Sequence, residues 1–332
     1  MNLSEYNYHL PKELIAQQPV RPRHSSKMLV VKDKVEHKKF SDIVNYLQKG
    51  DVLVVNETKV LPARIIGKKD GTGGKVDLLL SFPRDEYYEC KIKCTNAQPG
   101  HKLVFPHGLN GEIIDKEGEI YHVKFNKDVA KYMQKHGTLP TPPYVKEKLK
   151  REDHYQTSYA KKKGSLAAPT AGLHFSKKVL DEIKKKGVKI AKVCLHVSFG
   201  TFNPIKEDDF RKHQMDPEYF TVDKKTCDVI NNRKGRLVVV GTTSLKTLES
   251  SDYSGGQIQP SSGWSKLFVY PGHRFKCEAE ILVTNFHLPK STLLLFISAF
   301  AGKKRVFDAY KEAVKERYRF FSFGDAMLLF KE

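Results

Sequence analysis

Residues 237–250 read LVVVGTTSLKTLES, and this stretch decides the fold class. Four consecutive apolar residues rich in β-branched valine predict a fully buried strand. The small and polar Gly-Thr-Thr-Ser that follows is typical of a turn that opens a helix. A buried strand that runs directly into a helix is characteristic of α/β proteins.

The same pairing of strands and helices extends outward from this stretch in both directions. Further strands are predicted at residues 51–55, 188–197 and 281–283, and further helices at 41–47, 177–186, 291–302 and 306–318. Ser291 is expected to cap the helix that ends at Gly302. We therefore expect a layered α/β core with mostly buried strands.

Residues 61–150 have a different pattern. Short β-rich segments alternate there with Gly, Pro and Asp turns, which predicts a small antiparallel barrel or a sandwich. The sequence thus predicts two domains: a discontinuous α/β catalytic domain over 1–60 and 151–332, and an inserted β-barrel domain over 61–150.

The chain is strongly basic, which indicates a polyanionic partner. It carries 58 Lys and Arg against 38 Asp and Glu in 332 residues, a formal net charge of +20. Such an excess attracts nucleic acids, because every neutralised phosphate releases counterions. Lysines outnumber arginines 46 to 12, so a solvated lysine surface is the alternative explanation.

Cysteine usage and hydropathy point to a soluble cytoplasmic protein. The five cysteines include no CxxC pair, which favours free thiols over a disulfide framework or a zinc site. Residues 1–14 contain no apolar signal-peptide core. The longest apolar run, residues 293–301, is far shorter than the ~20 residues that cross a bilayer.

Polar segments at predicted strand-to-helix junctions are candidates for the chemistry. Residues 164–176 (GSLAAPTAGLHFS) combine small residues, which permit close backbone approach, with His174, a possible base or a structural histidine. Thr242, Thr243 and Ser244 form either an anion cradle or an ordinary helix cap.

Two further polar segments lie near the C-terminus. Asn285, His287 and Lys290 crowd the junction between a buried strand and an apolar helix. Asp325 follows an aromatic run that contains Arg319. Arg319 and its aromatic neighbours could stack on bases, or the aromatic residues could pack into the core. Nucleotide-binding glycine loops, HExxH and a nucleophile elbow are all absent from the sequence.

Taken together, these blocks resemble the S-adenosylmethionine:tRNA ribosyltransferase-isomerases of queuosine biosynthesis. The resemblance runs from LSEYNYHLPKELIAQQPVRPRHSSKMLV through GDVLVVNETKVLPARIIG, YQTSYA, GSLAAPTAGLHF, LHVSFGTFNP, GTTSLKTLES, LFVYPGHRF, TNFHLPKSTLLLFISAFAG and YRFFSFGDAMLLF. It covers nearly the whole chain in one consistent order.

The resemblance implies a specific reaction and fold. Such enzymes move the ribosyl part of S-adenosylmethionine onto 7-aminomethyl-7-deazaguanine at the wobble position of tRNA. The product is epoxyqueuosine-tRNA, and adenine and methionine are released. The family implies an α/β core with an inserted β-barrel, S-adenosylmethionine as cosubstrate and no metal. It also implies that the partner is a tRNA with a modified wobble guanine, bound through its anticodon arm. A monomer without an obligatory protein partner is the simplest expectation.

Site roles follow from the chemistry of this reaction. A carbon next to a sulfonium is acidic, so a general base removes a ribose 5′ proton; His174 is the first candidate and Asp325 the second. His287 or Asn285 would assist the departure of adenine. Cosubstrate contacts are expected from the following residues: Thr170, Gly172, Phe175, Phe202, Thr242, Thr243, Ser244 and Lys290.

Several positions depart from the usual family pattern. Lys246 stands where arginine is usual, Ser198 where glycine is usual and Asp216 where histidine is usual. A two-pronged guanidinium clamp is therefore not expected at Lys246. Two alternatives to the ribosyl transfer are an S-adenosylmethionine-dependent tRNA methyltransferase and a non-catalytic tRNA-binding protein.

Overall fold

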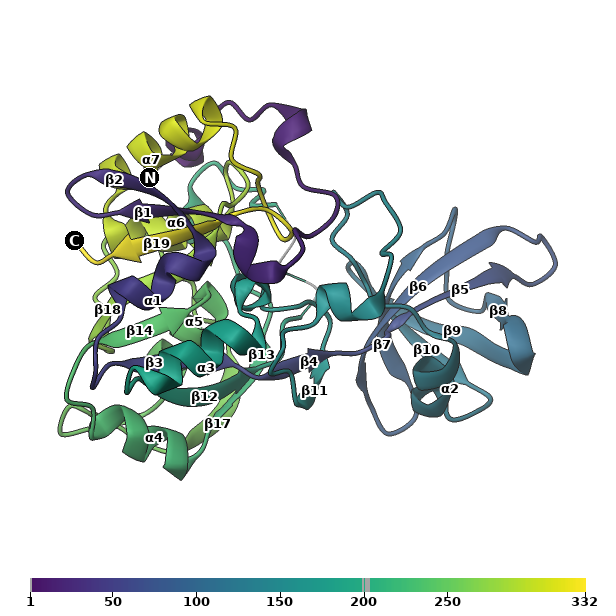
Figure 1. Ribbon diagram of the computed structural model, residues 1–332. Helices are drawn as coiled ribbons and strands as arrows, with labels where there is room; N and C mark the ends of the chain where they lie inside the picture. Colours follow the sequence, from purple (N-terminus) through teal and green to yellow (C-terminus); the bar gives the residue numbers. More distant parts are fainter. Residues whose placement is uncertain (1, 199, 201–203) are drawn as a thin grey trace. The chain divides into compact units, whose positions relative to one another are not determined.

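The computed structural model describes residues 2–198, 200 and 204–332, with Phe82 described by its backbone alone. The chain forms two compact units, which are shown in Figure 1. Unit 1 consists of Met1–Lys59, Pro142–Lys162 and Ala168–Glu332; unit 2 consists of Val60–Thr141 and Lys163–Ala167. The chain passes between the units four times: within β4 (Thr58–Val60), between Thr141 and Pro142, within β11 (Lys162–Ser165) and between Ala167 and Ala168.

The described residues of unit 1 form a nine-stranded mixed sheet. The strands lie in the order β17 (Ser261–Ser265), β13 (Glu218–Val222), β12 (Lys189–Leu195), β3 (Val52–Asn56), β14 (Leu237–Val240), β18 (Ala279–Asn285), β19 (Ala326–Phe330), β1 (Lys27–Val31) and β2 (Val35–Lys39). The four neighbours β12, β3, β14 and β18 are parallel to one another. β18 pairs antiparallel with β19, and β12 pairs antiparallel with β13.

Alternate residues of the central strands feed two separate cores, one on each face of the sheet. In β14, Leu237 and Val239 join one hydrophobic cluster, whereas Val238 and Val240 join the other. This division follows from the two-residue period of a strand. All four side chains are at most 2% exposed, as expected for a strand covered on both faces.

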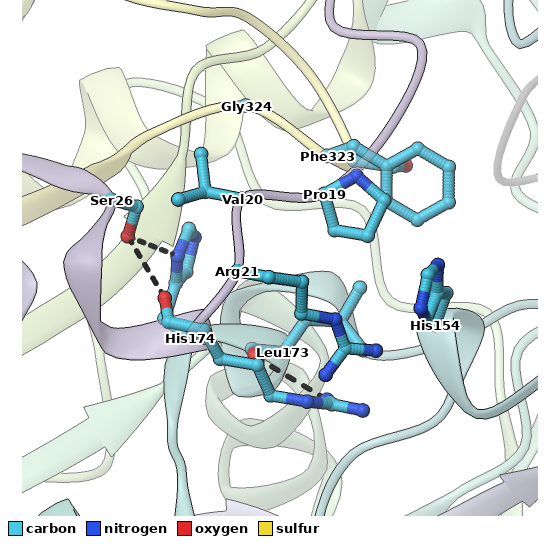
Figure 2. Close-up of a pocket in the computed structure, with 11 residues that line it drawn as sticks. Pro19, Val20, Arg21, Ser26, His154, Leu173, His174, Phe323 and Gly324 are labelled. Carbon is cyan, nitrogen blue, oxygen red and sulfur yellow. Dashed lines mark hydrogen bonds between the residues drawn. The ribbon is translucent and has the colours of Figure 1, made fainter. Parts of the chain in front are cut away.

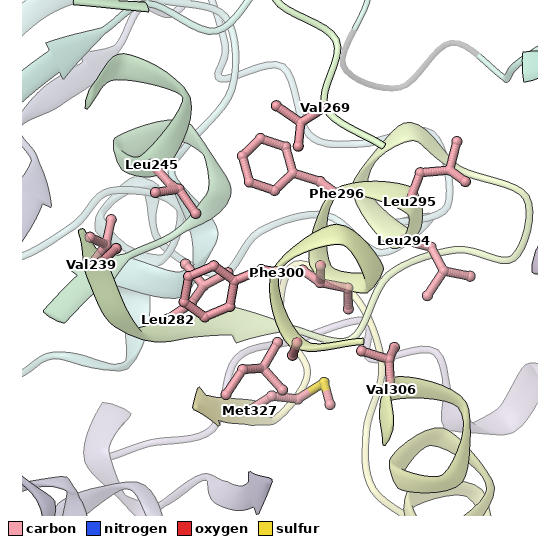
Figure 3. Packing of buried hydrophobic residues seen from close by; sticks show 14 of the residues in the cluster. Val239, Leu245, Val269, Leu282, Leu294, Leu295, Phe296, Phe300, Val306 and Met327 are labelled. Atoms are coloured by element: carbon pink, nitrogen blue, oxygen red, sulfur yellow. The ribbon is translucent and has the colours of Figure 1, made fainter. Parts of the chain in front are cut away.

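Helices cover both faces of this sheet. The unit contains α1 (Ile43–Tyr46), α3 (Lys177–Lys185), α4 (Lys224–Asn231), α5 (Thr242–Ser250), α6 (Thr292–Ala301) and α7 (Lys303–Lys315). The first two pack into one cluster, and the last four pack into the other. Figure 3 shows Leu294 and Phe300 of α6 packed with Leu282 of β18 and Val306 of α7.

The local signals at α6 act as the sequence predicts. Ser291 Oγ accepts the backbone N–H of Leu294, and the helix ends at Gly302, which has a φ of +80°. At residues 41–47 the structure differs in detail: a 3-10 turn, Phe40–Asp42, precedes the single turn of α1. The buried Phe40 fixes that entry by packing edge-to-face on Phe175 at 4.8 Å.

Unit 2 is built around a closed antiparallel barrel. Its strands are β5 (Arg64–Lys69), β6 (Lys75–Pro83), β7 (Tyr88–Lys93), β8 (Lys102–Phe105), β9 (Leu109–Glu117) and β10 (Ile120–Phe125), and α2 (Val129–His136) follows them. In β9, Leu109 and Ile113 are fully buried while Ile114 is 43% exposed. Closure removes the free edges that a sheet of this size would otherwise present. The fold class, an α/β core with a small all-β barrel, is confirmed.

Candidate active site

The parallel strands of unit 1 define a switch point between β3 and β14. The connection that leaves β3 for β12 passes through α3 on one face, whereas the connection that leaves β14 for β18 passes through α5 on the other face. In open α/β sheets, ligands bind outside the carboxyl ends of the strands at such a point. The residues that follow these strand ends are therefore the first place to look for a site.

A chain of hydrogen bonds lies beside this switch point and contains three of the predicted residues. Thr170 Oγ1 donates to Asn285 Oδ1 at 2.9 Å, and Asn285 Nδ2 lies 3.1 Å from His174 Nε2. His174 Nδ1 lies 2.8 Å from Ser26 Oγ. The 3-10 helix η7 (Thr170–His174), the end of β18 and the start of β1 thus meet at His174.

The direction of these bonds fixes the tautomer of His174. Asn285 Oδ1 accepts a hydroxyl proton from Thr170, so the amide NH₂ of Asn285 faces the imidazole. An amide NH₂ only donates, which makes Nε2 of His174 the acceptor and leaves the ring proton on Nδ1. Nδ1–H then donates to Ser26 Oγ. The chain of bonds holds the imidazole in one neutral form.

Burial keeps His174 neutral. Desolvation, reinforced by the positive charges of Arg319 and Arg23, lowers the pKa of His174 to about 3. The imidazole stacks on Phe40 with ring centroids 5.0 Å apart. His174 therefore offers an unprotonated Nε2 across the physiological pH range, with Asn285 occupying its lone pair.

A small pocket opens next to His174, and Figure 2 shows its lining. Its volume of about 20 Å³ is enough for one or two water molecules. Arg21, Arg23 and His154 line it together with His174. Arg23 is held by the backbone, since its Nη1 donates to the carbonyl of Gln156 at 2.7 Å. The pocket is thus positively charged around a neutral histidine.

Asp325 is held by backbone amides. Its Oδ1 accepts the N–H of Lys27 at 3.0 Å, and its Oδ2 accepts the N–H of Arg319 at 2.8 Å. Burial raises the pKa of this carboxyl group, which is 2% exposed. Asp325 therefore joins the start of β1 to the loop before β19, and it is not part of the lining of the His174 pocket.

His287 and Lys290 follow β18 but differ in their surroundings. His287 Nε2 lies 2.8 Å from Thr284 Oγ1, and its backbone N–H donates to Tyr310 Oη at 2.7 Å. Burial lowers the pKa of His287 to about 3. Lys290 is exposed and adopts a φ of +56° in the turn before α6. His287 is thus a fixed neutral group, and Lys290 is a surface cation.

The start of α5 supplies free backbone donors. Gly241 caps the helix at a φ of +84° without a side-chain bond, so the first amides of the helix have no intrahelical acceptor. Ser244 Oγ donates to the carbonyl of Val240 at 2.6 Å and is used within the helix. Thr243 Oγ1 is buried and has no hydrogen-bond partner among the described residues.

Two further predicted cosubstrate contacts are buried against protein atoms, and the third is not described. Gly172 is buried, and a Cβ at this position would overlap the hydroxyl of Tyr159. The missing side chain therefore makes room for Tyr159. The Phe175 ring is fully buried in the core. Phe202 lies outside the described residues.

Sequence reasoning missed a buried ion pair close to α5. Lys246 Nζ lies 2.7 Å from Glu218 Oε2, and both side chains are 7% exposed. These residues line a second cavity of about 40 Å³ together with Thr243. Lys246 and Glu218 stand on different elements 28 positions apart, so no local pattern could have paired them. The sequence signal for Lys246 was its place in the block GTTSLKTLES.

The described part of the chain holds no group of three or more His, Cys, Asp or Glu residues that could bind a metal ion. Among the helices of the described residues, none has the length and apolar character needed to cross a membrane.

Comparison with known proteins identifies the family. A model described as "Queuosine biosynthesis protein" matches residues 3–329. Proteins named S-adenosylmethionine:tRNA ribosyltransferase-isomerase from Acetivibrio thermocellus and Pelotomaculum thermopropionicum are 45% and 46% identical to this chain over 341 residues, which covers 99% of the chain and 100% of each relative. A crystal structure of S-adenosylmethionine tRNA ribosyltransferase from Thermotoga maritima is 35% identical with a TM-score of 0.56, covering 98% of this chain and 99% of that one. The chain belongs to the queuosine biosynthesis protein family.

Proposed function

We propose that this chain is an S-adenosylmethionine:tRNA ribosyltransferase-isomerase. It transfers the ribosyl moiety of S-adenosylmethionine to 7-aminomethyl-7-deazaguanine at the wobble position of tRNA and isomerises it. The products are epoxyqueuosine-tRNA, adenine and methionine. The observation that carries this proposal is the 45% identity, over 99% of the chain, to a full-length protein of that name. S-adenosylmethionine is the cosubstrate, and the proposed steps use no metal.

The base in this proposal is His174, and Asn285 positions it. The carbon next to the sulfonium is acidic, so loss of a 5′ proton needs an unprotonated acceptor with hydrogen-bond reach. Nε2 of His174 is unprotonated and lies 3.1 Å from Asn285 Nδ2. With a pKa of about 3 it is a weak base in the free protein, so the proposal requires this pKa to rise towards neutrality when the substrate binds. The substrate must displace this bond before the proton moves, and Ser26 continues to accept Nδ1–H afterwards.

Asp325 is the second candidate for the base. Each of its carboxylate oxygens already accepts a backbone amide, so proton transfer to it would weaken the loop it holds. His287 would assist the leaving adenine through a ring that Thr284 orients. Among these groups, the hydrogen-bond geometry supports His174 first, because its Nε2 is bonded by a side chain, whereas the oxygens of Asp325 are bonded by backbone amides.

The cosubstrate contacts in this proposal come from η7 and α5. Thr170 and Gly172 lie in the segment next to His174, and the amides of Thr242, Thr243 and Ser244 lie at the start of α5. Phe175 belongs to this set only through its packing. The burial of Phe175 makes its contribution indirect, through the packing of Phe40 beneath His174.

The RNA partner is a tRNA with the modified wobble guanine, contacted through its anticodon arm. The net charge of +20 supports a polyanionic partner. Lys290 is exposed, which suits a backbone phosphate better than the carboxylate of the cosubstrate. We also propose that the chain acts as a cytoplasmic monomer without an obligatory protein partner. All five cysteines are free thiols, as a reducing compartment requires.

A product assay tests the reaction. The full-length protein is incubated with S-adenosylmethionine and tRNA that carries the deazaguanine precursor, and the small products and the modified nucleoside are separated. The proposal expects adenine, methionine and epoxyqueuosine in equal amounts. Release of S-adenosylhomocysteine without adenine would indicate a methyltransferase, and tRNA binding without any turnover would indicate a binding protein.

A further inference from the structure

An open groove in unit 1 lies between α3 and the start of β12, which are side by side in Figure 1. Its volume is about 650 Å³, within the range of roughly 300–1,000 Å³ that is usual for ligand sites. Its charged lining residues are Lys177, Asp181, Lys184, Lys189 and Lys192, and apolar side chains form the rest of most of the lining. We call this feature the lysine groove.

The groove exists because one edge of β12 is open. The first five residues of β12, Lys189–Val193, pair with β3, but among the described residues β12 pairs with β13 only at Cys194 and Leu195. Lysines on an open strand edge hinder pairing with another chain, which is one explanation for Lys189 and Lys192. It does not explain the lysines of the opposite wall, because those lie on a helix.

The helical wall presents a row of positive charge. Lys177 and Lys184 are seven positions apart on α3, so they lie on one face of the helix, two turns or about 10 Å from each other. Both side chains are exposed, and Leu180 lies between them in the lining. This spacing suits a row of anions better than a single anion.

The groove keeps an excess of cations after its ion pairs are counted. Asp181 Oδ1 lies 3.4 Å from Lys184 Nζ, and Glu57 Oε2 lies 3.6 Å from Lys192 Nζ. The other two lysines of the groove form no ion pair with a described residue. Both side chains of the Asp181 pair are exposed, and such pairs are weak, so a phosphate can replace the aspartate carboxylate.

The groove also adjoins the segment that carries His174. Ser158 lines the groove, and its Oγ donates to the carbonyl of Phe175 at 2.8 Å. Tyr159 lines the groove as well, and its hydroxyl lies 2.1 Å from where a Cβ of Gly172 would be. A polyanion in the groove would therefore lie against the same part of the chain as η7.

We infer that the lysine groove binds the sugar-phosphate backbone of the tRNA substrate, with α3 contributing one row of lysines and β12 the other. This inference rests on the proposed function and locates part of its RNA interface. Lysine is a point charge on a flexible stem, and phosphate contacts of this kind position an RNA without reading its sequence. The apolar lining suits the carbon atoms of the sugars.

The salt dependence of tRNA binding tests the inference. The full-length protein is titrated with labelled tRNA that carries the deazaguanine precursor, and Kd is measured by fluorescence anisotropy between about 50 and 200 mM salt. The variant Lys177→Gln/Lys184→Gln/Lys189→Gln should raise Kd about 10- to 100-fold at the lowest salt. The slope of log K against log salt should become shallower by about 2, because each phosphate contact contributes about 0.7–0.9 to it.

A second triple variant separates local contacts from the general attraction of a basic protein. Lys34→Gln/Lys38→Gln/Lys39→Gln removes the same charge from exposed lysines in and beside the edge strand β2, at the other end of the strand order. It includes one lysine that is paired, since Lys38 Nζ lies 3.6 Å from Glu36 Oε2. This control should keep the salt slope of the wild type. Equal losses of affinity and slope in the two triple variants would overturn the inference.

Chemical acetylation of lysines, read by mass spectrometry, checks the contact without any substitution. Bound tRNA should slow the acetylation of Lys177 and Lys189 several-fold and leave that of Lys38 and Lys39 unchanged. Absence of this protection at a tRNA concentration that saturates binding would also overturn the inference. If adenine is still released by the wild type in that case, the proposed function stands and the tRNA binds through another surface.

Discussion

Asn285 Nδ2 donates to His174 Nε2 over 3.1 Å and thereby joins the carboxyl end of β18 to η7, across 111 positions of sequence. Both residues are at most 5% exposed. The bond orients a neutral imidazole beside a pocket that Arg21 and Arg23 line. The predictions for the chemistry begin with this pair.

Replacing His174 by alanine should reduce adenine release about 10²- to 10⁴-fold, the range for loss of a general base. Binding of tRNA should remain, because His174 is buried away from the surface. Loss of tritium from 5′-tritiated S-adenosylmethionine measures proton removal directly and should fall with turnover. His9→Ala, at an exposed histidine, is the control. Wild-type tritium loss in His174→Ala would exclude His174 as the base.

Replacing Asn285 by aspartate should raise the pKa of His174. A carboxylate in hydrogen-bond reach favours the protonated imidazole, typically by about 1–3 units. In the Asn285→Asp variant, the pKa of His174 should therefore lie closer to the ordinary histidine range than the value of about 3 in the wild type. An NMR titration of the ring ¹⁵N signals measures the change. An unchanged titration would mean that the two side chains do not contact each other in solution.

The stability of the protein should fall as the pH is lowered below about 6.5. Burial lowers the folded-state pKa of His174 and His287 to about 3, whereas an unfolded chain protonates both near 6.5. The unfolded state therefore binds more protons between these values, and each histidine contributes a slope of about 1.4 kcal/mol per pH unit. Above pH 6.5 the two histidines make their full contribution to the free energy of unfolding.

Urea unfolding at several pH values measures this slope. His174→Gln and His287→Gln should each make the decline from pH 6 to pH 4 shallower by about one proton. His9→Gln should follow the wild type. A decline that neither buried-site variant alters would contradict the assignment.

Replacing Gly137 by alanine should destabilise unit 2. Gly137 follows α2 with a φ of −76°, which any residue adopts, but a Cβ there would overlap the carbonyl of Pro62. Overpacking against a backbone atom costs about 1–3 kcal/mol. Thermal unfolding should show the loss. Gly74→Ala is the matched control, since its Cβ would have Thr72 Oγ1 at 3.6 Å as its nearest neighbour. Equal melting of the two variants would refute the clash.

Replacing Gly172 by alanine should impair activity through Tyr159. The new Cβ would overlap the Tyr159 hydroxyl and force η7 away from its position beside His174. The double variant Gly172→Ala/Tyr159→Phe removes the nearest overlapping atom, leaves Thr157 Cγ2 at 2.8 Å, and should recover part of the adenine release. Tyr159→Phe alone should be close to the wild type, because its hydroxyl has no partner among the described residues. A double variant no better than Gly172→Ala would refute this explanation.

Local sequence predicted much of unit 1, because its elements carry strong periodic signals. The strand at Leu237–Val240 has the bounds that its apolar run indicates. Ser291 and Gly302 bound α6 as their capping tendencies require. The start of the helix predicted at 41–47 was less well predicted: a 3-10 turn, Phe40–Asp42, comes first, and the Asp42 side chain accepts the N–H of Lys39 there.

Some candidate site residues could also be predicted from the sequence, whereas others could be found only in the structure. His174, Asn285 and Thr170 were selected for their residue types near strand ends, and the structure brings them into one chain of hydrogen bonds. Ser26, which completes that chain, lies 148 positions from His174. No periodicity connects such distant positions.

The sequence by itself determined the fold class, the closed barrel as one of two alternatives, the family and most of the segments that surround the site. Those properties depend on local periods of 2 and 3.6 residues and on short ordered motifs. Only the tertiary structure decided the partners of His174, the backbone anchoring of Asp325 and the pairing of Glu218 with Lys246. The physical reason is that strand order in the sheet sets these contacts. Burial then fixes the protonation state of His174, and burial is a property of packing that no single segment carries.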